Sequence, residues 1–290
     1  TTAYEILSGL VGSEMCIRDR CGLRYGGGVV SFGMSGRKGP IAVSTHISMV
    51  EVMEDWLVVD KPAPLIVHPT NDRPEPTLLG EVKTWLSGRG EDCTTLSILN
   101  RLDRETSGLV LMSRTKEAAR RFGRAMERRE IRKEYVAVVS GWPEWDRRTV
   151  TEPILRHGEV CESRIWIKQA IHPDGRPSVT HFEVMHRIEN RRGSFAVMRA
   201  IPETGRTHQI RVHLGHLGYP IVGDKIYGPS EECYLEFIET GWSDALEEML
   251  HLRRHALHAS RLVIPDEAGD LEWRSPMPRE FREFCEIESC

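Results

Sequence analysis

The stretch LSILNRLDRETSGLVLMS, residues 96–113, places a highly charged loop between two short apolar segments. Residues 96–99 and 109–113 predict strands, because brief apolar runs bounded by polar residues or glycine are typical of strands. Residues 100–107 predict the connecting loop, which ends at Gly108. The stretch therefore predicts a strand–loop–strand unit that displays charged side chains between two buried strands.

Outward from this unit, strands are more numerous than helices and occur in runs. Strands are predicted at residues 50–53, 56–60, 65–67, 133–140, 160–168, 179–188, 194–200, 261–264 and 271–274. Helices are predicted at residues 77–86, 116–129, 207–217, 231–250 and from 278 onward. Runs of strands favour an α+β fold with a mixed, largely antiparallel central sheet and flanking helices over an alternating βαβ fold.

Composition limits the class of protein. The chain has 290 residues, 40% of them hydrophobic and 28% charged, which is ordinary for a globular protein. No apolar run approaches the roughly 18 residues that cross a bilayer, so no membrane association is expected. Seven scattered cysteines contain no CxxC pair, which favours reduced thiols and a cytoplasmic location over disulfides or a zinc ribbon.

Three segments are expected along the chain. Residues 1–20 are predicted to be non-native or disordered, because GLVGSEMCIRDR at 9–20 resembles a translated sequencing adapter and lacks the features of a signal peptide. Residues 21–49, rich in glycine, are predicted to be an N-terminal extension. Residues 50–290 are predicted to be one catalytic domain.

Charge is distributed unevenly. The net charge of −4 argues against nucleic-acid binding through bulk charge, yet residues 101–133 hold eleven basic and five acidic residues. A solvated helix face is one interpretation of such a run. Binding of a polyanion is the other, and it is favoured because the run encloses the charged loop.

Within that loop, Asp103 has Arg101 and Arg104 as close neighbours. Guanidinium groups beside a partly buried carboxyl favour its ionised form, which suits a nucleophile or a general base. A surface salt bridge is the alternative that this spacing alone leaves open.

A second polar group occurs in residues 205–214, GRTHQIRVHL. Ile210 and Leu214 are four apart and predict the core side of a short helix, whereas Arg206, Gln209 and His213 lie on another face. An arginine at a helix start can hold an anion. Two partners remain possible for Arg206: a phosphate of the ligand or a carboxylate elsewhere in the chain.

The histidines permit a different hypothesis, a metal-dependent hydrolase. Two sets have suggestive spacing: His208, His213 and His216, and His251, His255 and His258. Neither set has the glutamate of an HExxH pattern or an acidic residue or cysteine at an obvious third-ligand spacing, so no bound metal is predicted.

Five motifs together resemble those of the RluA-type pseudouridine synthase family, in the family's order. They are VVDKPAPLIVHP at residues 58–69, LDRETSGLVL at 102–111, KEYVAVVSG at 133–141, GRTHQIRVHL at 205–214 and GDKIYG at 223–228. The resemblance assigns the catalytic aspartate to Asp103, the motif tyrosine to Tyr135 and the arginine that pairs with the aspartate to Arg206. It also implies that Arg101 takes the place of a flipped nucleotide.

The resemblance implies an isomerase that turns uridine into pseudouridine in structured RNA, either rRNA or tRNA, bound in a cleft of the domain. Arg101, Arg104, Gln209 and Arg211 are expected to contact that RNA. No cofactor and no obligatory protein partner are implied. Asp103 could attack C1′ or abstract the 2′ proton, and a non-catalytic RNA-binding module is the remaining alternative.

Overall fold

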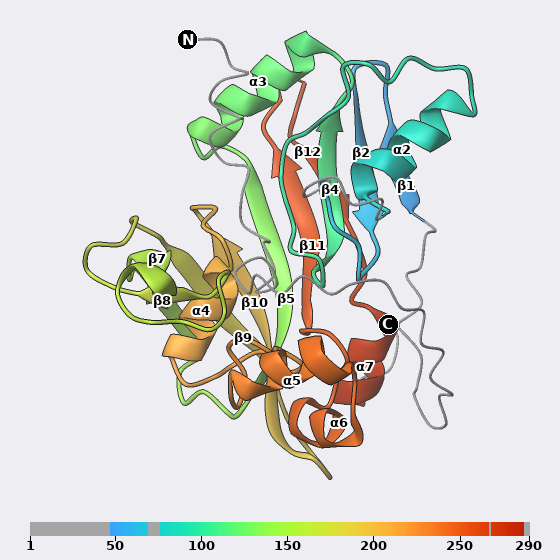
Figure 1. The fold of residues 1–290 in the computed structure, drawn as a ribbon. Coiled ribbons are helices and arrows are strands. Elements are labelled where there is room, and N and C mark those ends of the chain that lie inside the picture. Colours follow the sequence, from blue (N-terminus) through green and yellow to red (C-terminus); the bar gives the residue numbers. More distant parts are fainter. Residues whose placement is uncertain (1–46, 69–75, 267, 287–290) are drawn as a thin grey trace, which may run out of the picture.

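A ten-stranded sheet forms the centre of the molecule (Figure 1). The computed structural model describes residues 47–68, 76–266 and 268–286. The main path of the sheet runs β1 (Ser48–Val52), β2 (Trp56–Lys61), β4 (Ser107–Ser113), β11 (Leu257–Ile264), β5 (Arg132–Ser140), β10 (Gly193–Pro202), β9 (Thr180–Asn190) and β6 (Arg147–Val150). Strands β3 (Ser97–Ile98) and β12 (Leu271–Arg274) pair with β4 and β11, and β7 (Ile154–Arg156) pairs with β8 (Gln169–Ile171) in a separate sheet.

Most neighbouring strands are antiparallel. Within the described residues, β4 and β11 form the parallel pair of the large sheet, with Ser107 opposite His258 and Gly108 opposite Ala259. The mixed, largely antiparallel sheet predicted from the sequence is therefore confirmed.

Side chains of the central strands alternate between two cores, because successive residues of a strand point to opposite faces. On β4, Val110 and Met112 enter one hydrophobic cluster, whereas Leu109 and Leu111 enter the other. All seven residues of β4 are buried, which explains its nearly continuous apolar sequence.

Helices cover both faces of the sheet. The larger cluster is covered by α2 (Leu78–Ser87), α4 (Gln209–His216) and α7 (Arg279–Cys285), and the smaller one by α3 (Lys116–Glu127). Thr77 caps α2, because its hydroxyl accepts a hydrogen bond from the Gly80 N–H at 3.0 Å. Figure 1 shows α3 at the opposite end of the molecule from α7.

Three sequence-based element predictions are wrong. The helix expected at 231–250 is two helices, α5 (Glu232–Thr240) and α6 (Asp244–Leu250), separated where Gly241 has a φ of 81°. Residues 160–168 are not a strand; the chain there follows a single 3-10 turn (His157–Glu159) and buries only isolated side chains such as Ile165. Residues 65–67 contribute one bridge, between Ile66 and Thr77.

The predictions for residues 1–20 and for most of 21–49 lie outside the described residues. Within the ranges the structure describes, no helix has the length and apolar character that crossing a membrane requires.

Candidate active site

The charged loop 100–107 is held at its base by Asn100. The Asn100 amide donates to the Leu109 carbonyl at 3.1 Å and accepts from the Leu111 N–H at 2.7 Å. Within the loop, the Thr106 N–H donates to the Asp103 carbonyl, and Leu102 packs into the larger hydrophobic cluster. Leu102 is thus buried while the next side chain, Asp103, keeps 27% of its surface exposed.

Arg211 connects Asp103 to a second carboxylate. Its Nη1 donates to Asp103 Oδ2 at 2.9 Å, while Nε and Nη2 donate to the two oxygens of Asp224 at 2.7 and 2.9 Å. Asp224 is fully buried and also accepts from the N–H groups of Ile226 and Tyr227. The planar guanidinium fork therefore fixes the position of the Asp103 carboxylate relative to the rigid segment 224–227.

The resemblance assigned the ion pair with Asp103 to Arg206, and the structure corrects this prediction: the partner of Asp103 is Arg211. Arg206 precedes α4, and its Nε donates to the Pro177 carbonyl at 3.1 Å. The helix begins at Gln209 because His208 adopts a left-handed conformation with φ 54°. Arg211 then lies within the first turn of α4, from which its side chain reaches Asp103.

Burial and charge set the protonation states at this site. Burial alone would raise the pKa of Asp103, but the positive charges that His208 and Arg211 provide outweigh it and bring the pKa to about 2. Burial lowers the pKa of His208 to about 4. At neutral pH the permanent charge that faces the Asp103 carboxylate is therefore that of Arg211, and Asp103 is ionised.

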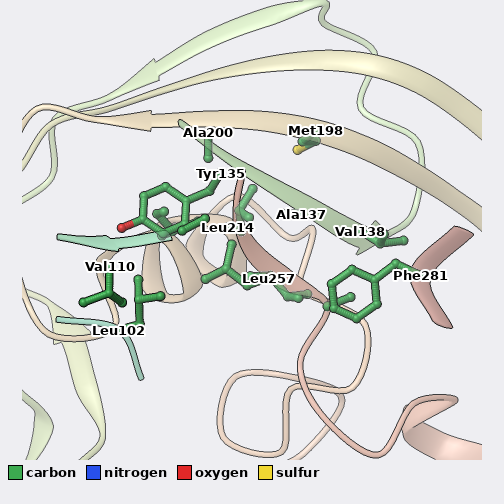
Figure 2. Close-up of a cluster of buried hydrophobic side chains, with 14 of the residues drawn as sticks. Leu102, Val110, Tyr135, Ala137, Val138, Met198, Ala200, Leu214, Leu257 and Phe281 are labelled. Atoms are coloured by element: carbon green, nitrogen blue, oxygen red, sulfur yellow. The ribbon is translucent and has the colours of Figure 1, made fainter. Parts of the chain in front are cut away.

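Tyr135 lies beside this carboxylate. Its ring packs into the larger cluster, and Figure 2 shows it next to Leu214 and Ala200 with the hydroxyl at the edge of the labelled group. Burial, followed by the negative charge of Asp103, raises the pKa of the phenol well above its usual value. Tyr135 therefore stays protonated near Asp103, with 8% of its surface exposed.

A second ion pair secures the other side of the loop. Lys225 Nζ donates to both Glu105 oxygens at 2.8 and 2.9 Å and to the Arg253 carbonyl at 2.7 Å. The Thr106 hydroxyl contacts His255 Nε2 at 2.7 Å. Adjacent residues of one segment, Asp224 and Lys225, thus hold the loop that carries Asp103 from two directions.

The residues predicted to contact RNA differ in accessibility. Arg101 and Arg104 are exposed. Gln209 is buried, and its amide is used inside the protein: Nε2 donates to the Val179 carbonyl and the Thr180 hydroxyl, and Oε1 accepts from Thr204 and from the Arg206 N–H. Arg211 is buried between its two carboxylates. The geometry therefore gives Gln209 and Arg211 internal roles in place of the predicted RNA contacts.

No role was predicted for Asp224, Lys225 or Tyr227 from the sequence. Their motif, GDKIYG at 223–228, was recognisable, but a carboxylate and a lysine in a short motif do not reveal which side chains they meet. The Tyr227 hydroxyl contacts His208 Nδ1 at 2.9 Å and accepts from the Gln169 N–H, so this motif also fixes the histidine next to Asp103.

Comparison with known proteins identifies the class. The family model described as RNA pseudouridylate synthase matches residues 55–216, which include the Asp103 loop, Tyr135 and Arg211. The chain therefore belongs to this family and is an RNA pseudouridine synthase, as the sequence resemblance predicted.

Among its relatives is the ribosomal large subunit pseudouridine synthase D of Escherichia coli K12. The two chains are 36% identical over 242 residues, which are 81% of this chain and 68% of the relative. The protein of the same name from Haemophilus influenzae is 34% identical over 245 residues, 84% of this chain and 71% of that one.

Solved structures agree on the fold. Human RNA pseudouridylate synthase domain containing 1 superposes with a TM-score of 0.59 at 27% identity, covering 80% of this chain and 84% of that one. Human RNA pseudouridylate synthase domain containing 4 gives a TM-score of 0.64 at 22% identity, covering 83% and 94%.

Proposed function

We propose that this chain isomerises uridine in large-subunit ribosomal RNA and that Asp103 is its catalytic carboxylate. The observation that carries the proposal is the contact between Arg211 and Asp103 at 2.9 Å, which keeps a partly exposed carboxylate ionised at a fixed position. The names of the bacterial relatives support large-subunit rRNA as the substrate over tRNA.

The reaction requires a carboxylate of this kind. The N1–C1′ bond of uridine breaks, the uracil turns, a C1′–C5 bond forms, the C5 proton is lost and N1 regains a proton, with no net oxidation or reduction. Asp103 either attacks C1′ to form a covalent ester or removes the 2′ proton to give a glycal. Both routes need the ionised carboxylate that its pKa of about 2 provides at neutral pH.

We propose that Tyr135 supports the base of the flipped nucleotide and that Arg101 occupies the gap that this nucleotide leaves in the RNA. A base must leave its stack before an enzyme can act on its glycosidic bond, and an aromatic ring is the usual support for such a base. Tyr135 supplies the ring beside Asp103. Arg101 is exposed two residues before Asp103 and is proposed to fill the gap left in the RNA, and the exposed Arg104 is proposed to contact the backbone.

We also propose that the enzyme acts in the cytoplasm and without a protein partner. The four cysteines that the structure describes, Cys93, Cys161, Cys233 and Cys285, are free thiols, which agrees with a reducing compartment. Activity of the purified chain on protein-free RNA tests independence from a partner.

The substrate test uses three transcripts made with C5-tritiated uridine: large-subunit rRNA, small-subunit rRNA and tRNA. We expect tritium release from the large-subunit transcript alone. Release from tRNA alone would overturn the rRNA assignment but retain the activity, whereas no release from any transcript by folded protein would contradict the proposed function.

A further inference from the structure

Tyr227 and His208 form a hydrogen-bonded pair next to the Asp103 carboxylate. The Tyr227 hydroxyl lies 2.9 Å from His208 Nδ1, and the two rings meet edge to face with their centroids 5.6 Å apart. The His208 side chain is buried, and its other ring nitrogen, Nε2, lies 3.9 Å from Asp103 Oδ2. A single imidazole therefore connects a phenol to the carboxylate to which the proposed function assigns the chemistry.

The partners of the Tyr227 hydroxyl determine where the His208 ring carries its proton. The Gln169 N–H lies 2.8 Å from the Tyr227 oxygen and can only donate, so this oxygen accepts from it. Gln169 begins β8, and its pairing with Arg156 of β7 holds the backbone there in place. In the described part of the chain, His208 Nδ1 is the one acceptor within reach of the Tyr227 proton. Nδ1 therefore accepts, and the proton of the neutral ring is on Nε2.

A charged imidazole does not fit these contacts. Both of its nitrogens would donate, which would leave the Tyr227 oxygen facing two donors and its own proton without an acceptor. The phenol keeps that proton, because burial raises the pKa of Tyr227 well above its usual value. Burial also lowers the pKa of His208 to about 4, which agrees with a neutral ring.

The carboxylate oxygen nearest to Nε2 is the one that Arg211 holds. Arg211 Nη1 donates to Asp103 Oδ2 at 2.9 Å. Among the residues that the structure describes, no donor contacts the other oxygen, Oδ1, which leaves Oδ1 open to a substrate. The 3.9 Å between Nε2 and Oδ2 is too long for a hydrogen bond, but such contacts at active sites often tighten once a substrate is bound.

We propose that Tyr227 holds His208 as the Nε2–H tautomer, so that the neutral ring donates a hydrogen bond to Asp103 Oδ2 while Oδ1 reacts with the nucleotide. The proposal rests on the proposed function, because it takes Asp103 as the reacting carboxylate. Tyr227 is then a positioning residue that acts through His208.

Both routes of the reaction end by restoring the Asp103 carboxylate. In the covalent route, the bond between Oδ1 and C1′ breaks as the C1′–C5 bond forms, and its electron pair returns to the carboxylate. In the glycal route, Oδ1 takes the 2′ proton and later gives it back to C2′. A donor aimed at Oδ2 stabilises the charge that returns in either case. A neutral donor does so without adding a second positive charge beside that of Arg211.

The tautomer is tested by NMR of the protein labelled with ¹³C and ¹⁵N at histidine, at neutral pH. The His208 signals are those absent from the spectrum of His208→Gln. We expect a neutral ring with its proton on Nε2, and a shift of the Nδ1 resonance in Tyr227→Phe. A ring protonated on Nδ1, or on both nitrogens, would overturn the proposal.

The role in the reaction is tested by single-turnover tritium release from C5-labelled large-subunit rRNA. Tyr227→Phe removes the hydroxyl and keeps the ring, which lies 5.1 Å from the Arg211 guanidinium. We expect a release rate about tenfold lower, with an unchanged dissociation constant for RNA. Tyr219→Phe is the matched control, because the Tyr219 ring packs on Trp145 and its hydroxyl makes no hydrogen bond to any described residue. It should change neither quantity.

Two replacements of His208 separate a donor from a space-filling side chain. His208→Gln keeps a neutral N–H donor at the end of the side chain, whereas His208→Leu removes it. His208→Leu should lower the release rate about 100-fold, and His208→Gln should regain about tenfold of that loss. Melting temperatures of both variants show whether they are folded. Equal release rates for two folded variants would contradict the donor role.

The outcomes distinguish this inference from the proposed function. If the wild type releases tritium and Tyr227→Phe matches Tyr219→Phe, the donor role fails and the proposed function stands. If Tyr227→Phe loses RNA affinity and release rate equally, the positioning role also fails. If folded wild type releases no tritium, the proposed function fails and the donor role fails with it.

Discussion

Arg211 is the residue on which the geometry of the site depends most. Its guanidinium is buried and donates to two carboxylates at once, through Nη1 on one side and through Nε and Nη2 on the other. A lysine has a single point of charge and could not hold both groups in one plane. Of these two carboxylates, Asp224 anchors the guanidinium, because two backbone N–H groups hold Asp224 itself in position.

Asp224→Asn tests this positioning role. The change removes the bidentate partner and leaves a buried guanidinium with half its charge compensation, so we expect a loss of about 3 kcal/mol of stability. A displaced Arg211 should misplace Asp103 and reduce turnover at saturating RNA about 100-fold. The dissociation constant for RNA should stay unchanged, because Asp224 is fully buried.

Urea unfolding, anisotropy and single-turnover tritium release measure these three quantities. Asp146→Asn is the control, because Asp146 pairs with Arg187 but is 82% exposed, and it should change each quantity little. Equal losses in RNA affinity and turnover for Asp224→Asn would contradict a positioning role.

The sequence predicted the Asp103 loop and the region that supplies its arginine, but not the arginine itself. The choice between Arg206 and Arg211 depends on where α4 begins. That point is marked by the left-handed conformation of His208, whose ring contacts Tyr227, a residue of a distant motif that no local pattern connects to it. The catalytic roles of Asp103 and Tyr135 remain predictions.

At the scale of elements, the parallel contact between β4 and β11 assembles the site. It places Ser107 against His258, with their side chains 2.9 Å apart, and brings the loop before β4 next to the segment before β11. Gly108 makes this approach possible, because a Cβ there would lie 2.3 Å from the Ala259 carbonyl oxygen, and its φ is +113°.

Gly108→Ala should therefore separate the two strands and destabilise the protein by about 3 kcal/mol or more, with a matching loss of turnover. Thermal unfolding followed by circular dichroism measures the change. Gly123→Ala is the matched control, because nothing lies within 4 Å of the added Cβ in α3, and it should stabilise the protein by up to about 1 kcal/mol. Similar melting temperatures for the two variants would refute the packing argument.

Lys61 connects the end of β2 to the same loop. It is completely buried, and its Nζ donates to the carbonyls of Pro62, Leu65 and Arg104 at 3.1, 2.7 and 3.2 Å. Lys61→Met should leave these carbonyls without that donor and cost on the order of 3 kcal/mol, whereas Lys83→Met on the exposed side of α2 should cost little. Denaturant titration of the two variants measures these costs, and equal costs would show that the buried Lys61 side chain does not support the loop.

Elements with strong local patterns were predictable, and those decided by tertiary contacts were not. The strand at 271–274 and the helix that begins at Lys116 follow from apolar periodicity and capping. Residues 160–168 have a strand-like sequence but form no strand in the structure, and the Arg156 guanidinium lies 3.8 Å from the centre of the Trp166 ring. The parallel β4–β11 pairing joins segments about 150 residues apart, which no local pattern reports.

For the whole molecule, the ten-stranded sheet with a hydrophobic cluster on each face gathers the motifs from five separate stretches at one place. Three histidines near the site are also buried in this arrangement: His208, His255 and His258. Burial is the main cause that lowers the pKa of each, to about 4 for His208 and His258 and well below the usual value for His255.

Because these three histidines are buried, we expect the stability of the fold to decrease in acid. The unfolded chain protonates histidine near pH 6.5, whereas the folded chain resists protonation down to about pH 4, so the unfolded state binds more protons between these values. The free energy of unfolding should therefore decrease by a few kcal/mol as the pH falls from 7 to 4.5. Asp103 causes a separate decrease in the free energy of unfolding only below about pH 4, because its pKa is lower in the folded state than in the unfolded state.

Guanidinium chloride unfolding at pH 7.5, 6 and 5 measures this dependence. Replacing the exposed His186 with Gln should leave the slope unchanged. An unfolding free energy that is constant between pH 7.5 and 5 would contradict the neutral, buried state of the three histidines.

The central claim is that the ionised carboxylate of Asp103 performs the isomerisation. Its most direct test is single-turnover tritium release from C5-labelled large-subunit rRNA by the wild type and by Asp103→Asn, an isosteric change that removes the charge. We predict release by the wild type and a loss on the order of 10³-fold or more in the variant, with RNA binding retained. The melting temperature of the variant should fall, because the buried Arg211 loses one of its two carboxylate partners. Equal rates for the two proteins would show that another group carries the chemistry.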